Sequence, residues 1–188
     1  GSYPERRFEP DDVRSINNFN TRLSGTLQKY ASQSGVFRLA AKYLPDADPD
    51  LFAELFDRGL LAESGGGLFV PTEPEDMRKP LLEFLMQTAG AGGHPAVERI
   101  FREIGEFMAV AWLESKWLLD PAVDQRILFG RLVKHRACFE LMVEGAHNVA
   151  PGLDLVVADG EMANTALMRQ LRDSKHHTVA QFAQAIGA

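Results

Sequence analysis

The sequence has almost no cysteine. Cys138 is the only one among 188 residues, so an internal disulfide cannot form and a cysteine-rich zinc site is excluded. Such sparse use of cysteine is typical of a reducing compartment, and we expect a cytoplasmic protein. Cys138 itself lies in an apolar-leaning helical segment, which predicts a buried, unreactive thiol rather than a nucleophile.

Long hydrophobic runs are also missing. The longest uncharged apolar run, residues 107–113, is too short to cross a bilayer, so no membrane partner is expected. The formal net charge is −6 and the isoelectric point is about 5.4, which disfavours attraction of the whole chain to nucleic acid or to anionic membranes. Residues 1–2, Gly-Ser, look like the remnant of a removed tag.

The common catalytic signatures are absent as well. The sequence contains no G-x-x-x-x-G-K-S/T, no G-x-S-x-G, no H-E-x-x-H and no G-x-G-x-x-G motif. The glycine-rich residues 64–67 precede neither a helix start nor a lysine, so a tight turn is favoured over a phosphate loop. We therefore predict no catalytic residue, no metal ligand and no resident cofactor in this chain.

Helical periodicity is the main pattern that is present. Apolar residues from 23 to 44 recur at helical spacing, with Gly35 as a candidate break and Pro45 as the expected end. Asp48 is then expected to cap a second helix, in which Pro49 takes the first position because its missing N–H would be unpaired there in any case.

Shorter elements are expected next. Two apolar runs within residues 60–70 flank a row of glycines and predict a small β-hairpin. Thr72 and Glu75 have the spacing of a capping box for the following helix, although that helix tolerates Pro80 only in its first turn or at a kink. The glycine-rich residues 90–93 predict a loop.

The longest predicted helix covers residues 95–119. Its first half is amphipathic, whereas its second half, residues 109–119, is apolar on almost every face and contains Trp112 and Trp117. A helix that is apolar all round is buried, so both tryptophans are assigned to the core and the helix is predicted to be the buried spine of the fold.

Two short strands are predicted in the last third of the chain, at residues 126–129 and 153–158, the first of them buried and ended by Gly130. A helix over residues 132–144, ended by Gly145, separates them, and a strand, helix, strand order favours parallel pairing. The predicted fold class is therefore α/β and mainly α, with a long central helix and a few short, parallel strands. Two more helices are expected at residues 163–171 and 178–186.

Several polar residues are candidates for a binding site. His94 precedes the long helix, whose N-terminus favours anions, but an exposed loop is the favoured interpretation. Two basic stretches are interpreted as solvent-exposed faces, with a phosphate or acidic-partner site as the minority reading. The first holds Arg126, Arg131, Lys134, His135 and Arg136, and the second Arg169, Arg172, Lys175, His176 and His177. Asp154, Asp159 and Glu161 bracket a strand end, where ligands and ordinary turns both occur.

Four short stretches have the order and spacing of motifs in one family. They are G-T-L-Q-K-Y-A-S at 25–32, G-H-P-A…I-F from 93 to 101, L-L-D-P…I-L-F-G from 118 to 130, and G-A at 187–188. The corresponding family motifs are G-C-L-E-x-x-x-S, G-D-x-x-A…I-(F/L), L-x-P…I-x-I-G-G and G-A. Over residues 19–188 the chain thus resembles the C-terminal lobe of ROK proteins, the bacterial sugar kinases and sugar-responsive repressors of the actin-like/hexokinase ATPase superfamily.

The departures from the family pattern are informative. The family's zinc motif, C-x-C-G-x-x-G-C, places its cysteines on Phe19, Thr21 and Thr26 of this sequence, so the zinc site is absent. The second glycine of the family's G-G motif on the adenine side is replaced by Arg131, which follows Gly130. The resemblance thus implies Gly130 and Arg131 as positions of nucleotide contact, where the arginine either crowds a nucleotide or contacts its phosphates.

The resemblance implies an incomplete lobe, the ribonuclease H-like half of an actin-like ATPase fold. The family's catalytic aspartate and first phosphate loop have no counterpart in this sequence, although phosphoryl transfer needs a positioned base and Mg²⁺ ligands. The predicted function is a non-catalytic C-terminal domain of a degenerate ROK-like protein that serves sugar or nucleotide binding, homodimerisation or regulation. The expected organisation is an irregular lead-in, residues 3–22, before one domain, residues 23–188.

Three alternatives remain. The chain is a fragment of an active ATP-dependent sugar kinase, or an unrelated helical protein-interaction module whose site is an exposed apolar groove. In the third, residues 36–70 are a winged-helix fragment with the order helix, helix, hairpin. That segment carries Asp50, Glu54 and Asp57 in place of a basic recognition helix, so binding of nucleic acid is not expected.

Overall fold

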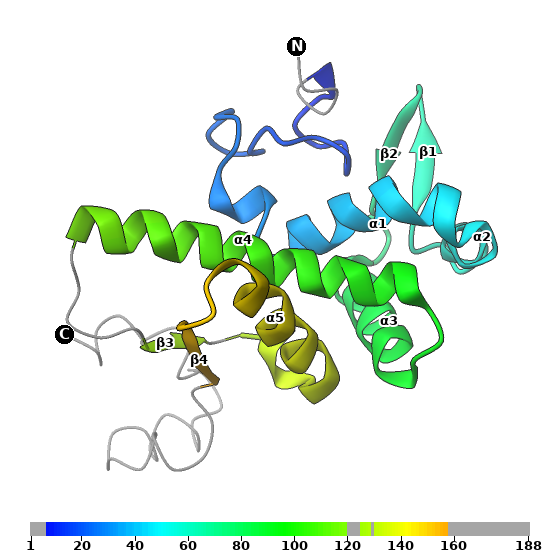
Figure 1. The fold of residues 1–188 in the computed structure, drawn as a ribbon. Coiled ribbons are helices and arrows are strands. Elements are labelled where there is room, and N and C mark those ends of the chain that lie inside the picture. Colours follow the sequence, from blue (N-terminus) through cyan, green and yellow to red (C-terminus); the bar gives the residue numbers. More distant parts are fainter. Residues whose placement is uncertain (1–6, 120–124, 129, 158–188) are drawn as a thin grey trace, which may run out of the picture.

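The computed structural model describes residues 7–119, 125–128 and 130–157, in which helices predominate (Figure 1). The mainly helical class with a few short strands is confirmed. In chain order the elements are the 3-10 helix η2 (Leu27–Lys29), α1 (Gln33–Ala47), α2 (Pro49–Asp57), β1 (Ala62–Ser64), β2 (Gly67–Phe69), α3 (Arg78–Ala91), α4 (Pro95–Leu119), β3 (Gln125–Leu128), the 3-10 helix η3 (Leu132–Lys134), α5 (Arg136–Val149) and β4 (Asp154–Val157).

Helix α4 has the predicted bounds and is central to the fold. Its first half carries Val97, Ile100, Phe101 and Ile104, none of which is exposed. These side chains join those of α1, α3 and α5 in one hydrophobic core, and the three helices surround this half of α4 (Figure 1). Burial of a whole helix face on several partners is what stabilises so long a helix.

The second half of α4 corrects the prediction of a fully buried helix. Trp112 is only 5 % exposed and belongs to a smaller apolar cluster with Leu153 and Leu155. Trp117, however, is 80 % exposed, and Leu118 and Leu119 beside it are exposed as well. The last turns extend past the described helices that pack on the first half (Figure 1), so their apolar composition does not lead to burial against them.

Helices α4 and α5 approach each other so closely that their backbones touch. A Cβ atom on Gly105 of α4 would lie 1.9 Å from the carbonyl oxygen of Met142, and one on Gly145 of α5 would lie 1.9 Å from that of Arg102. Gly145 therefore does not end its helix, as predicted, but lies inside α5, which continues to Val149. The missing side chain serves the contact between helices rather than helix termination.

The first two helices are predicted well at their junction and less well inside α1. Asp48 caps α2 as expected, since its side chain accepts a hydrogen bond from the amide of Leu51 at 3.2 Å. The predicted break at Gly35 and end at Pro45 are both wrong, because α1 begins after its cap Ser32 and continues through both residues to Ala47.

The predicted hairpin is confirmed as the antiparallel pair β1–β2, with Gly65 and Gly66 both at positive φ in its turn. The lead-in that precedes the helices packs on this hairpin. The amide of Val13 donates to the carbonyl of Leu68 at 2.8 Å, and the carboxylate of Asp12 accepts from the amide of Leu68 at 3.1 Å. Residues without regular secondary structure thus contribute Val13 to the core.

Helix α3 differs from its prediction at both ends. The capping box of Thr72 and Glu75 does not form, because α3 begins at Arg78 and its cap residue makes no side-chain cap bond. Pro80 then falls in the first turn, where proline is tolerated. At the other end Gly90 and its neighbour Ala91 are helical rather than part of the predicted loop.

The two strands near the end of the described chain pair in parallel, as predicted, with Gln125 opposite Asp154 and Leu128 opposite Val157. The prediction that the first strand is buried is wrong, since its residues alternate between exposed and half-buried positions. The helices expected at residues 163–171 and 178–186 lie outside the described residues. Within the described ranges, none of the helices combines the length and the apolar character needed to cross a membrane.

Candidate functional site

The candidate site begins where β3 ends. Gly130 and Arg131 connect this strand to η3 and α5, and ligands of α/β folds bind at the carboxyl ends of parallel strands. Gly130 has a φ of 111°, which a residue with a side chain rarely adopts, so the turn requires glycine at this position. The turn leaves Arg131 at the surface, directed away from the strand pair.

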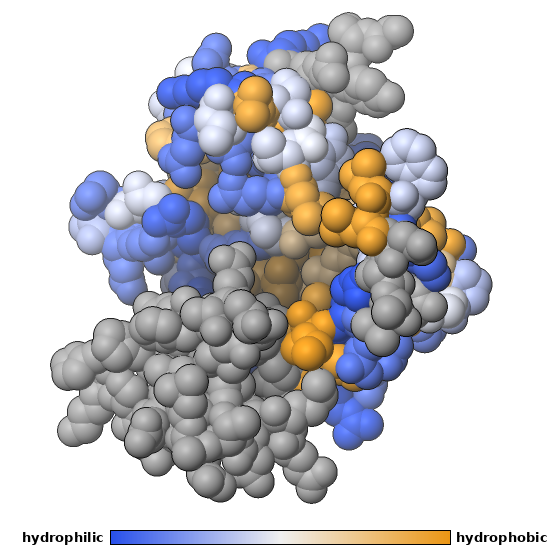
Figure 2. Space-filling model, turned by 90° about the vertical axis from the view of Figure 1, so that its left-hand side faces the viewer, coloured by the Kyte–Doolittle hydropathy of each residue, from blue (hydrophilic) through white to orange (hydrophobic). Residues whose placement is uncertain are grey.

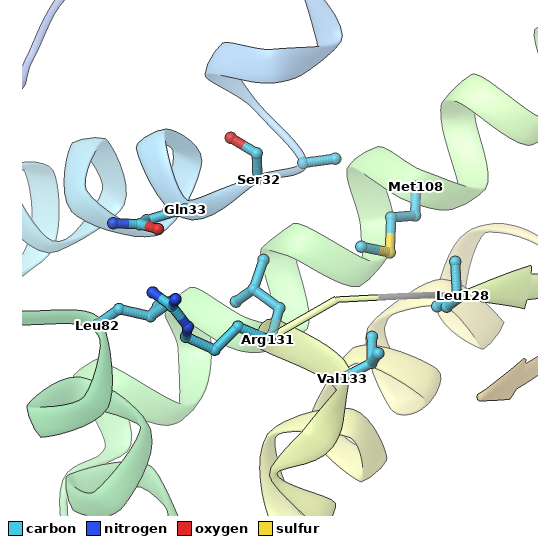
Figure 3. Close-up of a pocket in the computed structure, with 9 residues that line it drawn as sticks. Ser32, Gln33, Leu82, Met108, Leu128, Arg131 and Val133 are labelled. Atoms are coloured by element: carbon cyan, nitrogen blue, oxygen red, sulfur yellow. The ribbon is translucent and has the colours of Figure 1, made fainter. Parts of the chain in front are cut away.

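The guanidinium of Arg131 is not engaged by any other described residue, in either an ion pair or a hydrogen bond. Figure 3 shows the side chain reaching from the start of η3 toward Gln33 at the beginning of α1. An arginine presents five N–H donors in a planar fork that matches a carboxylate or phosphate. An exposed arginine that has no acceptor within the described ranges is therefore available to a ligand.

Arg131 lines two cavities. The smaller one has a volume of about 250 Å³, and apolar side chains make up most of its wall. Its lining residues are Ala31, Ser32, Gln33, Leu82, Met108, Leu128, Arg131, Leu132 and Val133, most of them visible in Figure 3.

The larger cavity, which we call the cleft, has a volume of about 1190 Å³. It is open, and it is as large as the sites that bind small molecules. Its walls come from four separate parts of the chain, namely residues 10–19 of the lead-in, residues 28–37 around the start of α1, residues 69–79 between β2 and α3, and Arg131.

Two of these walls are held together by polar bonds. The Gln33 side-chain amide donates to the carbonyl of Arg78 at 2.9 Å and thereby links α1 to the segment that enters α3. Ser32, which caps α1, accepts from the amide of Ser34 at 3.1 Å and donates to the carbonyl of Gln28. The start of α1 is thus bonded both to the segment that enters α3 and to the chain just before the helix.

Much of the charge on the cleft wall is internally compensated. Asp76 accepts three hydrogen bonds from Arg78, and these bonds lower the pKa of Asp76 to about 2. Asp12 makes the same three bonds with Arg14 and accepts the Leu68 amide as well. Burial raises the pKa of Asp12, but the bonds from Arg14 and Leu68 outweigh burial and leave it below its ordinary value.

Lys29 is the most buried cation on the cleft wall, with only 8 % of its surface exposed. Its ammonium donates to the carbonyl of Pro10 at 3.3 Å. Burial lowers the pKa of Lys29, the positive charge of Arg38 lowers it further, and the more distant Asp12 and Asp11 partly oppose both.

The other sequence candidates lie elsewhere. His94 donates from Nδ1 to the carboxylate of Asp48 at 2.7 Å, which ties the start of α4 to the cap of α2. Asp154 lies at the amino end of β4, opposite the edge that leads to Arg131, and accepts from Gln125 at 2.8 Å. Cys138 is fully buried, as predicted, and burial raises its pKa to about 12.

The basic stretch around η3 does not act as one surface. Arg126 lies 3.2 Å from the centre of the Trp112 ring, and Arg136 pairs with Glu140 at 2.7 Å. Only Arg131 of this stretch lines the cleft. Asp159, Glu161 and the basic residues from Arg169 to His177 lie outside the described residues.

Sequence reasoning identified Arg131 but not the other walls of the cleft. In the sequence, Lys29 and Ser32 are notable only as members of the family-like stretch 25–32. Residues 69–79 contain no motif that indicates a function. The available clue was that Lys29 is the only charged residue between positions 23 and 37. In the described part of the chain, histidine, cysteine, aspartate and glutamate do not gather in any group of three that could hold a metal ion.

Comparison with known proteins gives no further guidance. No match to a family model, to a curated protein or to a solved structure was found for this chain.

Proposed function

We propose that this chain is a ligand-binding lobe of a ROK-like protein and performs no chemistry itself. The observation that carries the proposal is Arg131, which follows the carboxyl end of a parallel strand, has no acceptor among the described residues and opens onto the cleft. The ligand would be a nucleotide or a sugar, whose phosphates or hydroxyl groups the guanidinium can bind in a bidentate manner.

The position of the family-like stretches supports this proposal. Residues 25–32 and 127–130 are about a hundred residues apart in sequence, yet Lys29 and Ser32 of the first stretch line the same cleft as Arg131, next to the second. The unit of β3, α5 and β4, with its parallel pairing, is also what one half of an actin-like ATPase fold would contain. The ribonuclease H-like fold is part of this proposal.

An active sugar kinase remains the alternative for the parent protein. Phosphoryl transfer needs a positioned base, Mg²⁺ ligands and two lobes that close on the substrate. Nothing in this sequence resembles the family's catalytic aspartate, so the chain by itself supplies one wall of such a site. Sugar-dependent ATP hydrolysis by a full-length parent would replace the non-catalytic proposal with this one.

The test is thermal unfolding of the chain with and without millimolar Mg-ATP, ADP and a panel of hexoses. A ligand at a hundred times its Kd stabilises by about 2.7 kcal/mol, which raises the Tm of a domain of this size by about 5–10 °C. Arg131→Ala should remove the shift, and Lys134→Ala is the matched control, because Lys134 is an exposed cation three residues away that lines neither cavity. A shift that survives in Arg131→Ala, or no shift with any ligand, would contradict the proposal.

Homodimerisation or protein interaction is a second candidate, which the end of α4 favours. Val110, Leu113, Trp117, Leu118 and Leu119 are all exposed there, and a soluble surface rarely presents so many large apolar side chains together. Figure 2, viewed toward this side of the molecule, shows apolar side chains among the polar ones. Molecular mass measured over a range of concentrations, for the wild type and for Leu113→Ser, tests this; a monomer at every concentration contradicts the homodimer.

A further inference from the structure

Lys29 has an unusual electrostatic position. Buried lysines are rare, and they are normally paired with a carboxylate because removal of the charge from water is costly. Among the described residues no carboxylate lies within ion-pair distance of the Lys29 ammonium, and its one acceptor is the Pro10 carbonyl, at the long distance of 3.3 Å. An ammonium has three donors, so two of them find no acceptor among the residues that the structure describes.

The surroundings do not supply the missing negative charge. Asp12 is the nearest buried acid, but its carboxylate is occupied by Arg14 and by the Leu68 amide. Asp11 is exposed and acts only from a distance. On the other side Arg38, which is also buried, donates its Nε to the Lys29 carbonyl at 3.1 Å and adds positive charge.

The cleft itself connects this cation to Arg131. Both residues line it, together with the apolar side chains of Phe37, Phe69 and Val70. Glu73 and Lys79 also line the cleft. The ammonium of Lys79 lies 3.8 Å from a carboxylate oxygen of Glu83. With Asp76 and Arg78 paired to each other, Lys29 and Arg131 are the cations of this wall that lack a carboxylate partner in the described structure.

We propose that the cleft binds an organic anion, with a carboxylate or phosphate group against Lys29 and the remainder of the molecule extending over the apolar wall toward Arg131. This inference rests on the proposed function, since it takes the cleft to be the ligand site, and it specifies the ligand as charged. The anion supplies the counter-charge and the acceptors that Lys29 lacks, and a charge-assisted hydrogen bond in a shielded site contributes more than one in water. The hydroxyl oxygens of an uncharged hexose can accept from the ammonium, but they supply no counter-charge.

The test compares charged and uncharged probes of similar size at constant ionic strength. Glucose 6-phosphate and citrate provide a phosphate and a carboxylate source, and glucose is the uncharged reference. The variants are Lys29→Met, which keeps most of the length of the side chain but not its charge, and Lys29→Arg, which keeps the charge. The affinity for each probe is measured by calorimetry. The stability of each variant is measured by its Tm without probe.

We expect at least one anion to bind the wild type more tightly than glucose does. Lys29→Met should weaken the binding of that anion by about 10- to 100-fold, as loss of a charge-assisted hydrogen bond does, while Lys29→Arg should retain it. Without probe, Lys29→Met should melt no lower than the wild type, because it removes a buried charge that has no carboxylate partner. A purely structural role for Lys29 would instead lower this Tm.

The outcomes separate the two proposals. Anion binding that Lys29→Met leaves unchanged but Arg131→Ala abolishes overturns the role of Lys29 and leaves the cleft as the ligand site. If glucose binds as tightly as either anion, the role of Lys29 is likewise overturned and the cleft remains the ligand site. If no probe and no nucleotide binds the wild type, both proposals are overturned.

Discussion

The contact between α4 and α5 and the lead-in wall of the cleft stabilise the same chain by different means. At the first, two helices meet through Gly105 and Gly145, and no side chain separates the backbones. At the second, irregular chain is held by the carboxylate of Asp12, which accepts a hydrogen bond from the Leu68 amide. Close packing of backbones tolerates no added volume, whereas a polar wall tolerates volume but depends on charge. The two regions should therefore respond to different perturbations.

The largest effect is expected from added volume between the helices. Gly105→Ala places a Cβ on the Met142 carbonyl oxygen, and since backbone cannot rotate away, α4 and α5 must separate. We expect a loss of about 3 kcal/mol or more in the free energy of unfolding. Gly152→Ala is the control, because a Cβ there meets nothing within 4 Å. Denaturant unfolding measures both, and equal stability of the two variants would refute the backbone contact.

The next effect comes from the charge of the cleft wall. Asp12→Asn removes a carboxylate that is 2 % exposed and leaves Arg14 without its partner, for an expected loss of about 2–3 kcal/mol. Asp76→Asn is an unusually close control, since Asp76 makes the same three bonds with the arginine two residues on but is exposed, and it should leave stability unchanged. Similar losses in both variants would show that burial of the pair is irrelevant.

Acid extends this comparison. The folded-state pKa of Asp12 is below its ordinary value, so its contribution is present above the unfolded-state pKa near 3.8 and is lost as pH falls through the folded-state pKa. The wild type should therefore lose more stability than Asp12→Asn on acidification below pH 4, measured by urea unfolding. Parallel pH profiles for the two proteins would contradict the assignment.

Alkaline pH should instead lower stability through the helical region, where α5 carries Cys138. Burial raises the pKa of Cys138 from 9.0 to about 12, so above pH 9 the unfolded chain loses this proton while the native one keeps it. Stability should fall by about 2 kcal/mol between pH 9 and pH 10.5, and Cys138→Ala should show a smaller decline. Tyr43→Phe is measured alongside, because burial and Glu103 also raise the pKa of Tyr43. An unchanged decline in Cys138→Ala would contradict the role of the thiol.

The smallest effect belongs to the exposed end of α4. Trp117→Ser removes a side chain that contacts mostly water, so the monomer should change by less than about 0.5 kcal/mol. Trp112, five residues earlier, is buried, and Trp112→Ala should cost about 3 kcal/mol. Comparable losses would mean that Trp117 is covered in solution, which would favour the interaction function.

Local signals made much of the fold predictable. The bounds of α4, the capping of α2 by Asp48 and the parallel pairing of the two late strands all follow from spacing and from short-range chemistry. Glycine was the main source of error. Gly35 and Gly145 were interpreted as breaks, but a Cβ at either would collide with the backbone of another segment. A sequence shows where a side chain is absent but not which neighbour requires its absence.

The candidate site was predictable only in part. Arg131 was identified through the resemblance to ROK proteins, whose G-G motif has a glycine where this sequence has Arg131. The cleft also needs Lys29 and the segment 69–79, which only the folded chain brings to Arg131. The exposure of Trp117 could not be predicted either. Composition shows that a helix is apolar, but it does not show whether the helices that pack on it extend along its whole length.

The two tryptophans also give the molecule an internal optical reporter. Trp112 is shielded and has the guanidinium of Arg126, from β3, 3.2 Å from its ring centre, whereas Trp117 on the same helix faces water. Their fluorescence should therefore differ in emission maximum and in access to a dissolved quencher. In Trp117→Phe the remaining emission reports whether β3 rests on α4, so detachment of the strand pair would be visible as a red shift before the helices themselves unfold.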